Sequence, residues 1–138
     1  CEALPGASRA KCAEGVWANG AAAGVQTSGV LINGVSTPRI DIVAHRWYRW
    51  RMVYVSSGPY IVPSLPGCEV GLLAKDGIYL STAPRPIMRG LMSTGQRADW
   101  VVRCPPGTHP FVSEPTNQTT GWMWQQQLAS VVATDQNE

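Results

Sequence analysis

Cysteine and histidine are the residues of this chain whose types and spacing could bind a metal. Cys104 closes a stretch of alternating polar and apolar residues, and the turn-forming sequence Pro-Pro-Gly-Thr joins it to His109. A thiolate and an imidazole on a loop between two strands suit copper in a trigonal site with two histidines, one cysteine and a weak axial ligand. His45 would then be the second imidazole, and Met92 or Met123 would have to be the axial ligand.

Cys104 also has a second possible role, because the chain contains four cysteines and no CxxC pair. An even number of cysteines without metal-ligand spacing is typical of disulfides in an oxidising compartment. Three pairings are possible, and we favour Cys1 with Cys12 as a local link and Cys68 with Cys104 as a bridge between strands. Four reduced, buried thiols are the alternative. A bridge at Cys104 removes the thiolate that copper needs, so we expect no bound cofactor.

Arginine and tryptophan supply the other candidate site residues, which we interpret as a protein interface. Arg49 and Arg51 share one face of a strand and could meet Asp76 or Asp99, while two tryptophans near the C-terminus share a face with period two. An exposed aromatic group beside arginine is a common anchor of protein interfaces, although core packing is the more frequent role of tryptophan. The interface candidates are Arg49, Arg51, Trp122 and Trp124.

Catalytic motifs are not apparent in the sequence. There is no nucleophile elbow and no triad spacing, and neither common glycine-rich phosphate loop occurs. We therefore predict no catalytic residue and no enzyme activity.

Short alternating segments separated by proline and glycine must position these side chains. The clearest covers residues 47–55, and Asn33-Gly34 and Asp76-Gly77 are strong signals for tight turns. Such spacing with almost no helical periodicity predicts an all-β fold of roughly 8–9 short strands, a sandwich or a barrel. Residues 1–27 are expected to be a coil that leads into a domain at 28–133, and 134–138 a polar tail. Strands are expected at 30–32, 39–43, 47–55, 60–62, 69–74, 78–80, 87–92, 96–104, 109–112 and 122–133.

The low content of charged residues bears on possible partners. The chain has 138 residues, enough for one domain, with 11 Lys+Arg, 9 Asp+Glu and a formal charge of +2. This balance excludes a strongly basic nucleic-acid surface. Charged residues make up 14%, where about 25% is usual, and lysine occurs only at Lys11 and Lys75. Arginine is enriched at protein interfaces, so we expect other protein subunits to cover part of this surface.

Four segments, in order, resemble the multicopper oxidases, the family of laccase, ascorbate oxidase and bilirubin oxidase. They are residues 30–34 (VLING), 48–51 (YRWR), 75–77 (KDG) and 95–102 (GQRADWVV). The likeness is to the second cupredoxin domain of those enzymes and implies a cupredoxin-like Greek-key β-sandwich. The family's copper sites use paired His-x-His motifs and a His-Cys-His cluster, whereas this chain has two histidines in all. The resemblance therefore implies a copper-free spacer.

The functional expectation is a non-catalytic structural or interaction subunit of a larger assembly, which the lineage of the fold associates with electron transfer. No apolar run approaches the roughly 20 residues of a membrane helix, although the chain could dock on a membrane complex. We expect an oxidising compartment such as the periplasm, the extracellular space or the thylakoid lumen. Because it begins with Cys1, we expect a processed form or a fragment. The alternatives are a spacer domain cut from a multicopper oxidase and a stand-alone copper carrier that uses His45, Cys104 and His109.

Overall fold

Alternation of more exposed and more buried side chains is clear in two strands of the computed structural model, which describes residues 30–56, 60–115 and 125–135. In β9 (Arg97–Arg103) the side chains of Ala98, Trp100 and Val102 are buried, while those between them are more exposed. In β4 (Tyr48–Val53) the exposed positions alternate in the same way. Successive side chains of a strand point to opposite faces, so each strand has one core face and one outer face.

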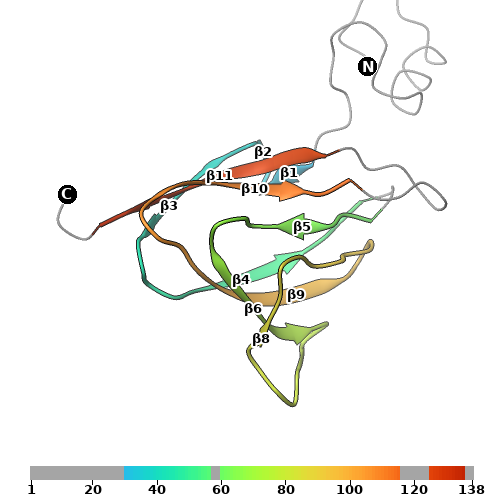
Figure 1. Ribbon diagram of the computed structural model, residues 1–138. Coiled ribbons are helices and arrows are strands. Elements are labelled where there is room, and N and C mark those ends of the chain that lie inside the picture. The colour runs from blue at the N-terminus through green and yellow to red at the C-terminus, as the bar shows by residue number, and fades with distance from the viewer. Residues whose placement is uncertain (1–29, 57–59, 116–124, 136–138) are drawn as a thin grey trace, which may run out of the picture. The chain divides into compact units, whose positions relative to one another are not determined.

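The described strands form two layers and a small hairpin (Figure 1). One sheet has the order β3-β11-β10-β5, with β3 and β11 parallel. The other has the order β4-β9-β6-β7, and β8 also pairs with β6. The remaining strands are β1 (Leu31–Ile32), β2 (Val35–Ser36), β3 (Arg39–Val43), β5 (Pro63–Ser64), β6 (Glu69–Lys75), β7 (Ile78–Tyr79), β8 (Arg85–Pro86), β10 (Gly107–Ser113) and β11 (Gln126–Thr134).

Aromatic side chains fill the space between the two sheets. The ring of Phe111 in β10 meets Trp50 of β4 edge-on at a centroid distance of 5.3 Å, and it meets Trp100 of β9 at 6.4 Å. Trp100 is 1% exposed, and Leu128 and Val131 of β11 are also buried. Edge-to-face contact is a favourable geometry for aromatic pairs. These contacts confirm the predicted all-β sandwich, with the core between the β4-β9-β6 and β11-β10 surfaces.

Turn signals in the sequence correspond to the observed hairpins. Asn33 and Asp76 adopt φ of 51° and 49°, and each precedes a glycine that also has positive φ. Positive φ at both central residues characterises the turns that join two-residue hairpins. These turns lie at the predicted positions and join β1 to β2 and β6 to β7; the strand β2 itself was not predicted.

Proline changes the strand pattern from the one expected. The described residues contain eleven strands, more than the roughly 8–9 predicted from the turn spacing. The strands expected at 60–62 and 87–92 are reduced to the isolated bridges of Ile61 with Met92 and Ser64 with Arg89. Proline has no N–H to donate to a ladder, and Pro63 and Pro86 lie in the two-residue strands β5 and β8 beside these segments. The start of the strand expected at 122–133 lies outside the described residues.

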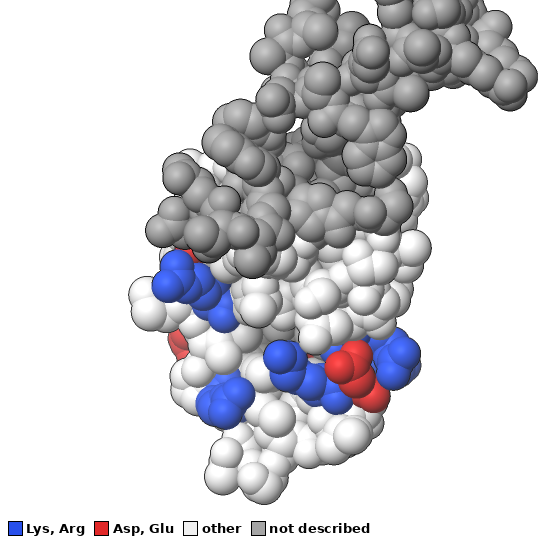
Figure 2. All heavy atoms as spheres, turned by 90° about the vertical axis from the view of Figure 1, so that its right-hand side faces the viewer, with Lys and Arg blue, Asp and Glu red and all other residues white. Residues whose placement is uncertain are grey.

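Residues Leu31–Glu138 form one compact unit by themselves. The described surface of this unit shows little charge. On the face drawn in Figure 2, lysine and arginine occur in a few separate groups, some beside an acid, and most of the visible described surface is uncharged. Within the described ranges, no helix is long and apolar enough to cross a membrane.

Candidate functional site

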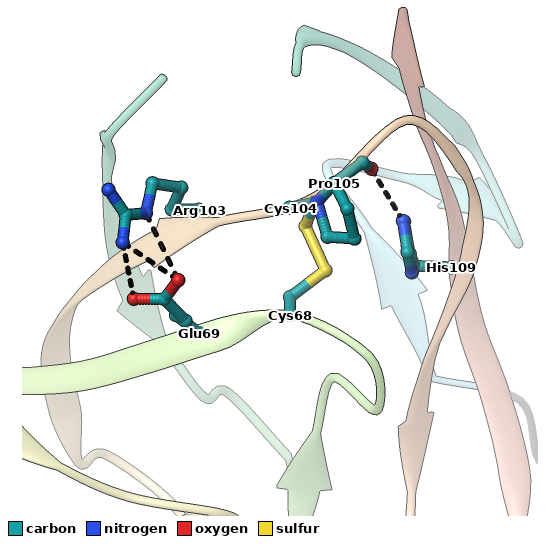
Figure 3. Close-up of a disulfide and its surroundings, with 6 residues drawn as sticks. All are labelled: Cys68, Glu69, Arg103, Cys104, Pro105 and His109. Atoms are coloured by element: carbon teal, nitrogen blue, oxygen red, sulfur yellow. Dashed lines mark hydrogen bonds and ion pairs between the residues drawn. A yellow bond between two sulfur atoms is a disulfide. The ribbon is translucent and has the colours of Figure 1, made fainter. Parts of the chain in front are cut away.

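Cys68 and Cys104 form a disulfide at one end of the five-stranded sheet (Figure 3). Glu69 begins β6 and pairs with Arg103, the last residue of β9. The two cysteines are therefore the next pair along the same antiparallel ladder, and their Cα atoms lie 4.4 Å apart. In an antiparallel ladder, two opposite residues that exchange no backbone hydrogen bonds have their Cα atoms ~4.5 Å apart, and the observed distance matches this value. The register of β6 and β9 thus places the two thiols opposite each other.

This disulfide confirms the predicted bridge between strands. It contradicts the alternative of four reduced thiols, because Cys68 and Cys104 are joined. The physical reason is that strand pairing already holds the two Cα atoms at a distance a disulfide can span. The other predicted pair, Cys1 with Cys12, lies outside the described residues.

His109 lies beside the disulfide. It belongs to β10, and its Nε2 is 2.9 Å from the carbonyl oxygen of Pro105, within the loop that follows Cys104. One ring nitrogen of His109 and the sulfur atoms of both cysteines all lie within 4.8 Å of one another. In the described part of the chain this is the one group of three cysteine, histidine or acidic side chains close enough to share a metal ion. Cys104 is fully buried, and Cys68 and His109 are half-buried.

His45, the second imidazole of the predicted copper set, does not join that group. It follows β3 with a φ of 60°, and its N–H donates a hydrogen bond of 2.8 Å to the carbonyl oxygen of Cys104. The backbone of His45 is thus adjacent to Cys104, while its side chain is exposed. Met92 is buried and bonded to Ile61 through the backbone. Met123 lies outside the described residues.

The structure therefore changes the composition of the predicted site. It brings Cys104 and His109 together, as the Pro-Pro-Gly-Thr turn suggested, but the third member is Cys68 instead of His45. A sulfur in a disulfide is not the thiolate that a blue-copper centre requires. The sequence contained no local signal for the approach of Cys68 to His109, because they meet only through the pairing of β6 with β9 and the return of the chain in β10.

Gly67 is a member of this site that sequence reasoning missed. It precedes Cys68, has a φ of 82°, and a Cβ added to it would lie 3.0 Å from Nδ1 of His109. A side chain there would press on the imidazole and would also strain the backbone. The Pro-Gly pair at 66–67 was visible as a turn signal, but its proximity to His109 was not.

Arg49 and Arg51, two of the interface candidates, lie on the outer face of β4 and meet Asp99 of β9. Arg49 donates two hydrogen bonds to Oδ2 of Asp99, one of them from Nε at 3.1 Å, and Nε of Arg51 lies 3.8 Å from the same atom. The hydrogen bond to Asp99 raises the pKa of the Arg49 guanidinium. Asp76, the other predicted acid, instead accepts a hydrogen bond from the backbone N–H of Arg97.

Two arginines of this sheet also contact exposed aromatic rings. The guanidinium of Arg103 lies 4.7 Å from the ring centroid of Trp47, and that of Arg49 lies 5.7 Å from the ring of Tyr79. Arg103 also pairs with both carboxylate oxygens of Glu69 at 2.8 Å. This sheet thus places arginine beside exposed aromatic groups, although the aromatic residues are Trp47 and Tyr79. Trp122 and Trp124, the aromatic candidates named from the sequence, lie outside the described residues.

Comparison with known proteins identifies the fold. No protein-family model and no curated protein matches the chain. The laccase-like multicopper oxidase CueO from Ochrobactrum sp. matches with a TM-score of 0.67 and 18% identity over 83% of this chain. The 2F4 variant of the multicopper oxidase McoA from Aquifex aeolicus matches with 0.69 and 19% over 78%, and the enzyme from Pseudomonas thermotolerans with 0.63 and 24% over 83%.

These matches cover only a part of each oxidase. The chain corresponds to 25%, 25% and 26% of the lengths of those three proteins, so it spans about a quarter of each. At these identities the likeness establishes the fold. The chain has the cupredoxin-like β-sandwich fold found in multicopper oxidase domains, as the resemblance of its sequence segments implied.

Proposed function

We propose that this chain is a copper-free cupredoxin-like domain with a structural role, which packs against other domains or subunits of a multicopper oxidase-like protein. The observation that carries the proposal is the Cys68–Cys104 disulfide. Cys104 is the residue that would supply the thiolate of a copper site with His109, but its sulfur is bonded to the sulfur of Cys68. In this proposal oxidase chemistry belongs to neighbouring domains, and this chain would be the second cupredoxin domain, which acts as a spacer between them.

Exposed apolar side chains support the packing role. Met88 is 90% exposed, Val55 81% and Ile78 74%, although each is a large hydrophobic group. Scattered exposed apolar residues are normal on a monomer. The described surface also has the arginine–aromatic pairs of Trp47 and Tyr79, and these are residue types enriched where proteins meet.

The disulfide also supports an oxidising compartment outside the cytoplasm. Disulfides persist where thiols are not kept reduced, as in the periplasm, in secreted proteins or in an organelle lumen. The partners we propose are protein domains or subunits, including those of a membrane-bound electron-transfer complex. Nucleic acid is not among them, because a formal charge of +2 supplies too few phosphate contacts.

The first test is a copper titration of the oxidised chain. Cu(II) is added to the disulfide form, and bound metal and visible absorption are measured. We expect no intense thiolate-to-copper band, since the disulfide provides no thiolate, and we expect no change when His45→Ala is tested in parallel. A blue chain with one tightly bound copper would refute the copper-free part of the proposal.

The second test is the size of the protein in a mild extract of its native source. We expect elution far above the 14.9 kDa of the chain, as part of a larger protein or complex. Met88→Asp places a charge on an exposed apolar position and should weaken that association. Val35→Asp adds the same single charge at an exposed apolar residue of the β1-β2 hairpin and is the matched control. Elution of the native protein as a free monomer would refute the packing role.

A further inference from the structure

We propose that reduction of the Cys68–Cys104 disulfide creates a binding site for a thiophilic divalent cation such as Zn(II). The ligands are Sγ of Cys68, Sγ of Cys104 and Nδ1 of His109. This set differs from the copper set His45, Cys104 and His109, because it uses two sulfurs and excludes the exposed His45. The inference does not depend on the proposed packing role.

Distances between the donor atoms favour this site. The sulfurs and a ring nitrogen of His109 all lie within 4.8 Å of one another. In a tetrahedral zinc site, Zn–S bonds of about 2.3 Å and Zn–N bonds of about 2.0–2.1 Å place neighbouring donors about 3.3–3.8 Å apart. A disulfide holds its two sulfurs about 2.0 Å apart, so they must separate by about 1.7 Å once that bond is broken, and the imidazole needs to approach by at most about 1 Å. Two sulfurs and an imidazole with one open position are a known coordination for zinc.

The hydrogen bond of His109 orients its imidazole for metal binding. A backbone carbonyl can only accept, so the 2.9 Å contact with Pro105 requires a proton on Nε2. In the neutral ring Nδ1 then carries the free lone pair, and it is this atom that faces the backbone of Gly67, next to Cys68. Histidines that bind metals usually donate their other N–H to a carbonyl or a carboxylate in this way.

The strands keep the two thiols adjacent when the disulfide is broken. Cys68 and Cys104 follow the Glu69–Arg103 pair in the ladder of β6 with β9, and the side chains of that pair are joined by hydrogen bonds of 2.8 Å (Figure 3). Cys104 is buried, whereas Cys68 and His109 are partly exposed. The protein thus supplies a positioned pair of sulfurs with one side open to solvent, through which a cation can enter.

The chemistry balances with a phosphine or a dithiol as the reductant. The disulfide accepts two electrons and two protons and becomes two thiols, while a phosphine is oxidised to its oxide with an oxygen atom from water. Metal binding then releases the two thiol protons, since the thiolate is the ligand. Two thiolates neutralise a divalent cation, and this avoids leaving a net charge in a site where one sulfur is buried.

The experiment uses the full chain with Cys1→Ser and Cys12→Ser, so that these two cysteines cannot bind metal. It is reduced with a phosphine, freed of reductant under argon and titrated with Co(II) as the probe, followed by Zn(II). We expect the oxidised chain to bind no Co(II). We expect the reduced chain to bind one equivalent, with thiolate charge-transfer and tetrahedral d–d absorption that Zn(II) abolishes. His109→Ala should weaken binding at least tenfold, and His45→Ala should leave it unchanged.

Several results would overturn the inference. One is a reduced chain that takes up no Co(II), and another is uptake that does not change in His109→Ala. Circular dichroism of the reduced chain is the control for folding, and loss of its β spectrum that Zn(II) does not restore would also overturn it. A blue copper band in the oxidised chain would refute the proposed function instead, so the two failures are distinguishable.

Discussion

Replacement of Cys68 and Cys104 together by alanine is expected to lower the free energy of unfolding by about 4 kcal/mol. The bridge joins residues 36 apart in the sequence. For a closed loop of this size, the chain-entropy relation gives about 13 cal/mol/K, or about 3.8 kcal/mol at 25 °C. Cys104 is fully buried, so loss of its sulfur also removes packing contacts in the folded state. The loss is a large part of the roughly 5–15 kcal/mol that stabilises a domain.

The assay is equilibrium unfolding in urea, with Cys1→Ser and Cys12→Ser in the parent and in the variant. Reduction of the parent with a phosphine, in the absence of metal, should give nearly the same loss as the double replacement. Zn(II) should then restore part of the stability of the reduced parent and none of that of the variant, because a ligand that binds only the folded state stabilises it. A loss below about 1 kcal/mol would refute the loop-entropy reasoning.

Three further changes test the core and the ion pairs. In Gly90→Ala the new methyl would lie 2.6 Å from Cζ2 of Trp100, so we expect a loss of about 1–3 kcal/mol in urea unfolding; an unchanged midpoint would contradict this close approach. Leu128 is 2% exposed, so Leu128→Ala should lower the free energy of unfolding by about 2–5 kcal/mol in the same assay. A loss close to zero, as expected for a surface leucine, would contradict its burial in the core. The hydrogen bond from Arg89 lowers the pKa of Glu114 in the folded protein. The ionised Glu114 therefore stabilises the fold at any pH above the pKa of glutamate in the unfolded chain, and this contribution is lost as the pH falls through the pKa of Glu114 in the folded protein. Glu114→Gln should flatten that acidic part of the stability profile, and an identical profile would rule the contribution out.

Side-chain alternation and turn chemistry explain why the fold class could be predicted. The alternation in β4 and β9 is a local property, since each residue's neighbours in the sequence decide which face of a strand it occupies. Asn33-Gly34 and Asp76-Gly77 are local as well, because positive φ is a requirement of the turn itself. The pairing of the segments around Pro63 and Pro84 was harder to predict from the sequence, because the bridges there depend on which partner strand lies within reach.

The candidate site could be predicted only in part. Cys104 and His109 are near in sequence and were expected to be near in space, and the bridge to Cys68 was one of three open pairings. Nothing in the sequence pattern placed Gly67 against His109, and His45 was named as the second imidazole because it is the other histidine of the chain. The choice of Asp99 over Asp76 as the acid that meets Arg49 was likewise open.

The amino-acid sequence by itself determined the features that arise between neighbours: strand faces, tight turns, a scarcity of charge and the resemblance to a cupredoxin-like domain. The tertiary structure decided which distant groups meet. The pairing of β6 with β9 sets Cys68 opposite Cys104, and the return of the chain in β10 sets His109 beside them. The physical reason is that a strand's periodicity is encoded residue by residue, whereas its partner and register follow from the burial of whole faces in one core.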